Sequence, residues 1–288
     1  MAKENKVYDY VTERILDRLE KGVVPWKKPW DGGVSYNFES RRPYNGMNTF
    51  LLPQAGGYVT FKQAQKMGGK IKKGEKGHMI TFWRMLKRTE KDENGDRKES
   101  VFPLLRYYTV FHLSQTEGIE YSAEDMNGTA HDVVTCSDAE DVVAAYIANG
   151  GPALEKVKGN DAYYAPRQDK VVVPLQSQFA EQEKYYSTLF HELTHSTGSG
   201  LRLARFNSAA MNFGNYDYGK EELVAELGAA MLCQFCGIAS DNSEENSAAY
   251  IASWMKTIKA DKKLFVQAAG LANKAVRYIK GEKISFEQ

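Results

Sequence analysis

Apolar residues recur at helical spacing near the start of the chain. Between residues 6 and 21 an apolar side chain returns at every fourth position, from Val7 to Leu19, with polar residues between. This spacing places one apolar stripe along a helix, and Gly22 follows as a stop signal. We therefore predict a helix over 6–21, followed by an irregular segment, VVPWKKPWDGG, whose prolines exclude a regular helix.

A strand pattern comes next. Residues 79–85 form a run of apolar, β-branched and aromatic side chains, and the segment 101–113, VFPLLRYYTVFHL, has the same character. The Asn94-Gly95 pair between them is typical of a hairpin tip, so we expect the two runs to pair. A short helix is expected over 62–67. Together these elements predict an α+β N-terminal domain with a small antiparallel sheet and helices over residues 1–120.

The composition becomes acidic and polar after residue 115, where large apolar side chains are rare. We expect a linker over 121–136 and a second domain over 137–288. Residues 161–175 indicate two short strands across a turn at 167–169, and their last residues, VVVPL, are expected to lie at the edge of a short sheet. Helical patterns cover 137–149, 181–197, 219–236, 243–258 and 261–280. The whole chain is therefore predicted to be α+β, with a mainly helical C-terminal domain.

The net charge of +1 hides an uneven distribution. Residues 1–88 contain 18 Lys and Arg against 8 Asp and Glu, a net of +10, whereas the remainder contains 20 against 29, a net of −9. A length of 288 residues allows one large domain or two ordinary ones. The asymmetry favours two domains, of which the first meets a polyanion. Chance clustering of solvated lysines is the alternative interpretation.

Several classes of protein are disfavoured by composition. The chain has no run of 18 apolar residues, so we expect no membrane-spanning helix and no membrane partner. The N-terminus, MAKENKVYDYVTERI, has no apolar core of a secretion signal. Three cysteines, an odd number, do not suggest a disulfide framework. We expect a cytoplasmic protein.

The motif with the clearest chemistry is His191-Glu192-Leu193-Thr194-His195. Two imidazoles four residues apart lie on one face of a helix and can reach one ion. Zinc suits two such nitrogens plus a carboxylate, with a fourth position left for water, although manganese or cobalt would fit the same ligands. Glu192 is then placed to act as general base. The alternative is an ordinary helix with two surface or capping histidines.

A third ligand is expected from a later helix, GKEELVAELGAAMLC. Glu222 and Glu226 lie one turn apart there, and we assign Glu222 to the metal. Glu226 would accept a hydrogen bond from the outward ring nitrogen of a ligand histidine. The reverse assignment stays open, Glu221 is a weaker candidate, and an acidic helix start that complements the macrodipole would also explain part of the pattern. A three-histidine site is excluded, because Leu201 stands where the third histidine would be.

Other reactive side chains give weaker signals. Peptide oxyanions at such centres are commonly helped by Tyr, His or Arg, and the candidates are Tyr216, Tyr218 and Arg205. Cys233 and Cys236 have no partner pair, so we expect buried cysteines without chemistry. Three histidines have no spaced partner and are interpreted as structural: His78, His112 and His131.

Cations and aromatic side chains interleave in the first 88 residues, as non-specific binding of single-stranded nucleic acid requires. The expected DNA contacts are Trp26, Lys27, Lys28, Trp30, Tyr36, Arg41, Arg42, Tyr44, Asn45, Asn48, Lys72, Lys73 and Lys76. For the four aromatic residues of this set, a place in the core is an equal alternative. For Trp83, Tyr107 and Tyr108 the core is the favoured interpretation.

These residues resemble a known family, the ArdC-type antirestriction proteins of conjugative plasmids, phages and other mobile elements. The N-terminal resemblance lies in PWxxPW, RPYNGMN, TFKQAQKMGGKIKKGEKG and YYTVFHLSQTEGI. The C-terminal resemblance lies in YYSTLFHELTHSTG and YGKEELVAELGAAML, so that nearly the whole chain is covered. The resemblance implies an N-terminal domain that binds single-stranded DNA, a C-terminal zincin-like domain, and protection of incoming DNA from host restriction.

Three hypotheses follow. The first is a DNA-binding zinc metallopeptidase with a protein substrate. The second is a single-strand DNA-binding module whose metal site is structural and non-catalytic. The third is a metallopeptidase whose basic domain recognises an acidic protein, which the salt dependence of DNA binding would distinguish from the first.

Overall fold

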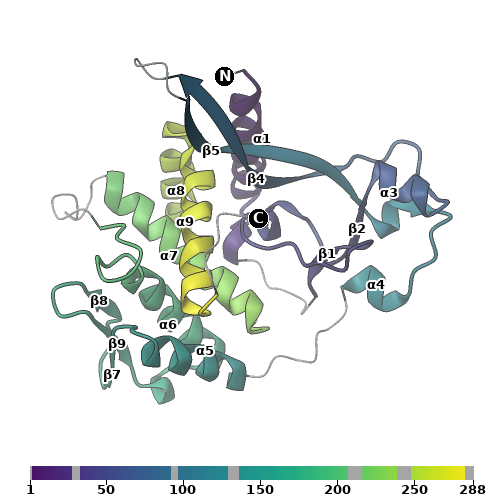
Figure 1. Ribbon diagram of the computed structural model, residues 1–288. Coiled ribbons are helices and arrows are strands. Elements are labelled where there is room, and N and C mark those ends of the chain that lie inside the picture. Colours follow the sequence, from purple (N-terminus) through teal and green to yellow (C-terminus); the bar gives the residue numbers. More distant parts are fainter. Residues whose placement is uncertain are drawn as a thin grey trace.

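The computed structural model describes residues 2–27, 33–91, 97–128, 136–206, 216–238 and 248–282. A long two-stranded hairpin lies across one end of a helical body (Figure 1). The N-terminal elements are α1 (Ala2–Glu20), η1 (Pro25–Lys27), β1 (Ser35–Asn37), α2 (Asn48–Leu51), β2 (Gly56–Thr60), α3 (Phe61–Lys66), β3 (Lys70–Ile71), β4 (His78–Lys91), β5 (Arg97–His112), η2 (Leu113–Gln115), β6 (Thr116–Glu117) and α4 (Ala123–Asn127). The C-terminal elements are α5 (Cys136–Ala148), β7 (Ala153–Val157), β8 (Tyr163–Ala165), β9 (Lys170–Pro174), η3 (Gln176–Gln178), α6 (Gln182–Ser196), α7 (Tyr216–Phe235), α8 (Ala248–Ala260) and α9 (Leu264–Ile279).

The α+β class is confirmed, and the N-terminal sheet is built on the predicted hairpin. Its strand order is β1-β2-β5-β4, with β2, β5 and β4 antiparallel and the short β1 parallel to β2. The strand expected over 79–85 is longer than its apolar run, because β4 and β5 stay paired from His78↔Val110 to Lys91↔Arg97. The hairpin tip expected at residues 94 and 95 lies outside the described residues. The expected short helix is α3. Its N-terminus has a capping box, in which the side chains of Thr60 and Gln63 each accept a hydrogen bond from the other residue's backbone amide.

The predicted first helix is α1, and its apolar stripe faces the C-terminal helices. Val7, Val11, Ile15 and Leu19 are all at most 2% exposed and belong to the largest hydrophobic core. In Figure 1, α1 lies close to α8 and α9, which pack against it. The main core therefore contains residues from both ends of the chain.

Trp26 belongs to the same core, and its predicted contact with DNA is wrong. The indole is 1% exposed and packs against the rings of Trp254 and Phe265, with centroids 5.9 and 5.7 Å away. Burial of so large a ring stabilises the fold, and a ring buried in the core cannot stack on a base. The alternative interpretation of Trp26, a place in the core, is therefore confirmed.

Part of the stretch expected as a linker is folded onto the N-terminal sheet. Ser122 caps α4 by accepting a hydrogen bond from the Asp125 amide, and α4 packs against β2. Asp125 in turn binds the side chains of Tyr36 and Arg41. The stretch 129–135 lies outside the described residues.

The C-terminal sheet differs in order from the one expected. Its order is β7-β9-β8, so the VVVP strand, β9, is central and not an edge. It pairs in parallel with β7, a strand that the sequence did not indicate, and antiparallel with β8. Val171, Val172 and Val173 are at most 5% exposed, so both faces of this strand are buried, which explains why it is apolar at consecutive positions.

The predicted C-terminal helices are observed as α5 to α9, with ends that differ from the expected ones by a few residues. Residues 243–247, expected to begin α8, lie outside the described part of the chain. Among the described helices, none combines the length and apolar composition needed to cross a bilayer.

Candidate metal centre

The centre begins with α6, whose sequence separates a buried face from a face that meets α7. Tyr185, Leu189 and Leu193 recur every four residues and are at most 1% exposed, so this stripe anchors the helix in the core. His191 and His195 lie on another face, where their side chains are 22% and 14% exposed. The core-facing positions of the helix therefore remain apolar, and both imidazoles lie on a different face.

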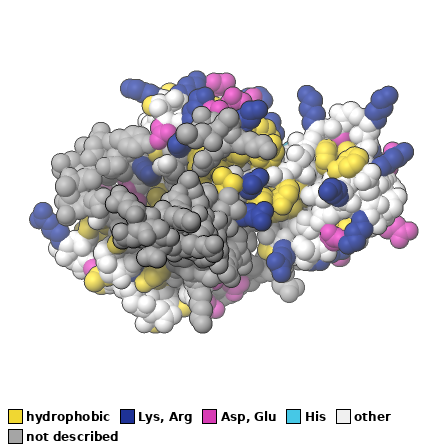
Figure 2. All heavy atoms as spheres, turned by 45° about the horizontal axis from the view of Figure 1, so that its top comes forward, with side chains coloured by type: hydrophobic (Ala, Val, Ile, Leu, Met, Phe, Trp, Pro, Cys, Tyr) yellow, Lys and Arg dark blue, Asp and Glu magenta, His cyan; other side chains and the backbone are white. Residues whose placement is uncertain are grey.

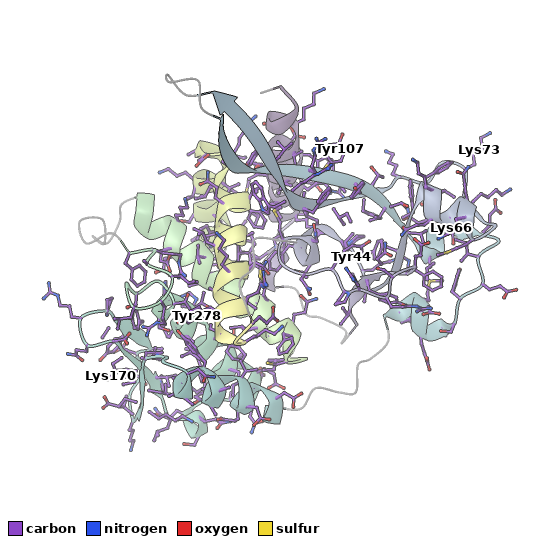
Figure 3. The ribbon with its side chains drawn as sticks, in the orientation of Figure 1. Tyr44, Lys66, Lys73, Tyr107, Lys170 and Tyr278 are labelled. Carbon is purple, nitrogen blue, oxygen red and sulfur yellow. The ribbon has the colours of Figure 1, made fainter. Side chains whose placement is uncertain are left out.

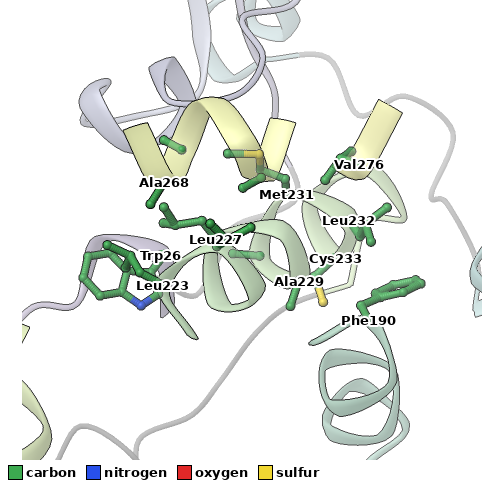
Figure 4. Packing of buried hydrophobic residues seen from close by; sticks show 14 of the residues in the cluster. Trp26, Phe190, Leu223, Leu227, Ala229, Met231, Leu232, Cys233, Ala268 and Val276 are labelled. Atoms are coloured by element: carbon green, nitrogen blue, oxygen red, sulfur yellow. The ribbon is translucent and has the colours of Figure 1, made fainter. Parts of the chain in front are cut away.

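α7 supplies the acidic partner and is held against α6 by close packing. Leu223 and Leu227 are fully buried, and they lie in the core cluster beside Trp26 (Figure 4). At Gly228 the two helices approach so closely that an added Cβ atom would lie 2.5 Å from Thr194 Cγ2. Because Thr194 stands between the two histidines, this glycine sets the separation at which α7 faces them.

Three predicted ligands meet between the two helices. Nε2 of His191 and Nε2 of His195 are 3.1 Å apart. The Glu222 carboxylate lies 3.6 Å from each of them, through Oε2 and Oε1 respectively. One ligand atom from each residue lies within 4.8 Å of the others, which makes this a group able to hold a metal ion within the described part of the chain.

The donor set fits a divalent cation. Two imidazole lone pairs at 3.1 Å repel each other unless a proton or a cation lies between them. Two nitrogens and one carboxylate oxygen are the three protein ligands of catalytic zinc centres that keep one open position. Burial alone would lower the pKa of His191, but the hydrogen bond to Glu222 and the charges of Glu226, Glu192 and Glu222 raise it above its usual value. The same acidic surroundings favour a metal ion.

A buried acid and a buried guanidinium fix the second histidine. Nδ1 of His195 lies 3.4 Å from Oε1 of Glu221, which can only accept a hydrogen bond, so Nε2 is left free to bind a metal. Arg205 donates to both oxygens of Glu221, at 3.1 and 2.7 Å, and to Thr197 Oγ1 and Thr194 O. The pKa of Glu221 is lowered, since the hydrogen bonds from His195 and Arg205 outweigh the opposing effect of burial.

This network was not predicted. Glu221 was only a weak candidate for the metal, and Arg205 was a candidate for assisting the oxyanion. The Arg205 side chain is 7% exposed and fully engaged by Glu221, Thr194 and Thr197, so that candidacy is wrong. The other two candidates, Tyr216 and Tyr218, have side chains outside the described set. No spacing signal could have paired Glu221 with Arg205, because Arg205 comes from the loop after α6.

Glu226 lies on the side of His191. Its charge contributes to the raised pKa of His191, which is consistent with a place behind that ligand. Its Oε1 accepts a hydrogen bond from the Tyr250 hydroxyl at 3.0 Å, a contact that the sequence did not suggest. Besides Glu222, two further glutamates of α7 thus lie near different histidines, with Glu221 behind His195 and Glu226 near His191.

Glu192 follows the first ligand and is 8% exposed. Its charge also acts on His191. A carboxylate at this place can take a proton from an attacking water and return it to a leaving amine. Cys233, Cys236 and His112 agree with their expected structural places, whereas His131 lies outside the described residues. Cys233 and Cys236 are buried, burial raises the pKa of the Cys233 thiol to about 12, and the buried His112 ring binds Met126 O at 3.0 Å.

The residues predicted to bind DNA divide into three groups. Lys28 and Trp30, together with the side chain of Lys27, lie outside the described set. Arg42, Asn45, Lys72, Lys73 and Lys76 are exposed. Lys72 also donates to Ser114 O at 2.7 Å.

The residues of the third group make contacts within the protein, although the Arg41 side chain is still 58% exposed. Tyr36 is 7% exposed and its hydroxyl donates to Asp125, so its predicted stacking on bases is wrong. Arg41 binds Asp125 and lies over the Phe38 ring at 4.5 Å. Asn48 holds the backbone of Thr81 through two hydrogen bonds. Tyr44 is half-buried with its ring edge-on to Tyr58.

Two aromatic residues assigned to the core are instead exposed. Tyr107 and Tyr108 are 49% and 55% exposed, so the favoured interpretation for them is wrong. Trp83 is half-buried and packs against the main core, as expected. Strand alternation along β5 could not have predicted this, because Tyr107 and Tyr108 project from opposite faces and both are exposed.

Comparison with known proteins agrees with this geometry. Residues 141–271 match the family described as zincin-like metallopeptidase, and residues 5–111 match the N-terminal domain of anti-restriction factor ArdC. Two Escherichia coli proteins named DNA primase TraC are 30% and 31% identical over the full chain. The chain spans only 20% and 28% of the length of these relatives.

Two solved structures are similar over nearly their whole length. The metal-free crystal structure of the antirestriction ArdC protein from the R388 plasmid is 33% identical, with a TM-score of 0.73, and the match covers 95% of this chain and 96% of that one. Its Mn(II)-bound structure is 31% identical, with a TM-score of 0.72 and coverage of 97% and 99%. The fold and the clustered HExxH residues therefore define a zincin-like domain joined to a second, N-terminal part. The chain belongs to the family of ArdC antirestriction proteins.

Proposed function

We propose that this protein is an antirestriction factor that binds single-stranded DNA and hydrolyses peptide bonds at a divalent-metal centre. The observation that carries the enzymatic part is the convergence of His191, His195 and Glu222, with one ligand atom of each within 4.8 Å of the others. Zinc is the metal that this ligand chemistry favours. The Mn(II)-bound relative supports a divalent ion of this general kind.

The chain's own residues divide the work of the reaction. Glu192 accepts the proton of the attacking water and passes it to the leaving amine. Glu221, held by Arg205, keeps the His195 ring in the tautomer and orientation that leave Nε2 available. A bound divalent cation would supply Lewis-acid polarisation of the peptide carbonyl and of the water.

Glu192→Gln tests the catalytic role. The variant is expected to keep its metal, measured by atomic emission, and to lose about 100-fold or more of its hydrolysis of labelled casein. His191→Ala is the control that loses both. If the unchanged protein binds metal but hydrolyses casein no faster than Glu192→Gln does, the metal is structural and the peptidase proposal is refuted. Full protection of incoming plasmid DNA by Glu192→Gln in a restricting host would show that antirestriction does not depend on the peptidase activity.

The DNA-binding part is supported by the family match over residues 5–111 and by the net charge of +10 on residues 1–88. Gel-shift titration with single-stranded and double-stranded oligonucleotides tests it. Binding that prefers single strands and weakens steeply with salt is expected, because phosphate contacts release counterions. Binding of neither form would refute this part and leave the metal centre untouched.

A further inference from the structure

The β4–β5 hairpin carries an aromatic pair that faces solvent in the half farther from its tip. The rings of Phe82 and Tyr108 are parallel within 4°, with centroids 4.8 Å apart. Tyr108 is 55% exposed and Phe82 is half-buried. Stacked rings usually lie inside a core or an interface, where they bury apolar area. This pair instead leaves a flat aromatic surface uncovered on a sheet.

The pairing register shows which side chains share that surface. Phe82 pairs directly with Arg106, and Arg84 and Tyr108 lie two residues from them along each strand. Paired residues, and residues two apart, project from the same face of a sheet. Phe82, Arg84, Arg106 and Tyr108 therefore form one patch, the hairpin platform. Its two arginines are exposed, and neither forms an ion pair with a described carboxylate.

The other face of the hairpin is used differently. Trp83 and Leu105 project from it and pack against the main core. Tyr107 shares that face but is still 49% exposed. Two adjacent tyrosines of β5 thus have nearly equal exposure on opposite faces, and only Tyr108 belongs to the platform.

The basic character continues from the platform toward α3. Lys73 and Lys76 precede β4 and are exposed. Figure 3 shows Lys73 beside α3, at the end of the molecule to which the hairpin leads from Tyr107. Hydrophobic side chains adjoin Lys and Arg side chains on the face that Figure 2 turns forward. Cations at intervals along a surface with flat rings between them match a chain of phosphates with unpaired bases.

We propose that the hairpin platform is where unpaired bases of single-stranded DNA stack, with their phosphates against Arg84 and Arg106. The proposal rests on the proposed function, because it assumes that this protein binds single strands. A duplex would not use Tyr108 in this way, since its bases are already stacked on each other. An acidic protein would use the arginines but has no reason to require a flat ring at position 108.

Tyr108→Ala and Tyr107→Ala form the matched test. Anisotropy of a fluorescein-labelled oligothymidylate is expected to show affinity about 10-fold weaker for Tyr108→Ala, because one base loses its stacking partner. Tyr108→Phe keeps the ring and is expected to stay within about two-fold of the unchanged protein. Tyr107→Ala removes an equally exposed ring from the other face and is expected to have as small an effect.

Arg84→Gln and Arg106→Gln test the phosphate contacts. Each is expected to reduce the slope of log affinity against log salt by about 0.7, the value for one phosphate of a single strand. Arg167→Gln, at an exposed arginine in the turn between β8 and β9, is the control and should leave the slope unchanged. Polyglutamate as competitor tests the acidic-protein alternative. That alternative predicts that Tyr108→Ala and the unchanged protein bind polyglutamate equally well and more tightly than they bind DNA.

Equal effects of Tyr107→Ala and Tyr108→Ala would overturn the platform while leaving single-strand binding in place. Unchanged binding by Tyr108→Ala would do the same. Failure of the unchanged protein to bind any single strand would overturn the proposed DNA function and the platform together. Weakening confined to Tyr108→Ala and the two platform arginines supports the proposal.

Discussion

The metal centre and the hairpin platform differ in how their residues are brought together. His191 and His195 are one helical turn apart, so local periodicity alone places both on one face of α6. Phe82 and Tyr108 are far apart in sequence and meet only through the register of two long strands. A site built within helices is therefore visible in the sequence, whereas a site built across strands needs the pairing first.

The largest expected effect tests whether Trp26 serves folding or DNA. Trp26→Ala removes a ring that packs between Trp254 and Phe265, and we expect it to lower the free energy of unfolding by about 3–5 kcal/mol. Urea denaturation measures this change. Phe61→Ala, at a 53% exposed position, is the control and should shift stability by less than about 0.5 kcal/mol. A stable Trp26→Ala protein with weak DNA binding would reverse our assignment.

A second prediction concerns the residues behind the ligands. Arg205→Ala leaves Glu221 without its guanidinium, so His195 loses a fixed orientation, and metal affinity is expected to fall by about 10- to 100-fold. Competition with a chromophoric chelator measures the affinity. Arg202→Ala is the matched control, because Arg202 is equally buried but binds Asp169 and contacts no ligand histidine. Equal losses of affinity in both variants would show general damage to the fold.

Gly228→Ala tests the close contact between α6 and α7. The added methyl would meet Thr194, and overpacking there is expected to cost about 1–3 kcal/mol and to displace Glu222 from the histidines. Gly270→Ala on α9 meets open space and should instead stabilise the protein by about 0.5–1 kcal/mol. Thermal unfolding with and without added zinc compares the two. A Gly228→Ala protein as stable as Gly270→Ala, with normal metal affinity, would mean that the helices can separate freely.

The smallest predicted effect concerns Tyr36. Tyr36→Phe removes the hydroxyl that donates to Asp125 at 2.8 Å, and the expected loss of stability is about 0.5–1.5 kcal/mol. DNA affinity should not change, because the ring is buried on the side of α4. Anisotropy titration of the same oligothymidylate checks this. A clear loss of affinity would show that Tyr36 belongs to the DNA-binding surface. The hairpin platform would then not be the whole of that surface.

Helices were the part of the fold that the sequence indicated best. α1, α6 and α9 carry apolar side chains at helical spacing, and this signal is local. The short strands β1 and β7 were missed because each pairs in parallel with a partner that follows later in the chain. A parallel pair has no hairpin turn to mark it, and β7 has mostly exposed side chains with no apolar run.

The candidate site shows the same limit. The spacing of HELTH and of Glu222 was sufficient to predict three residues that the structure brings together. Arg205 was assigned the wrong role because its contacts are set by the path of the loop after α6, which carries no periodic signal. Tyr107 and Tyr108 were assigned to the core by composition, but Tyr107 is 49% exposed although it shares a sheet face with the buried Leu105. Which part of a sheet face is covered depends on the elements packed on it, and composition does not show this.

The packing of α1 against α8 and α9 has a consequence for how such a gene can be divided. Thr12 donates to Lys262 O at 2.7 Å, Lys262 pairs with Asp9, and the apolar side of α1 covers the last two helices. A chain divided anywhere between residues 111 and 141 would expose to water the apolar surface that α1 shares with α8 and α9. Recombination between relatives should therefore exchange α1 together with the C-terminal helices that it covers, even though the two ends of the reading frame are the parts farthest from each other.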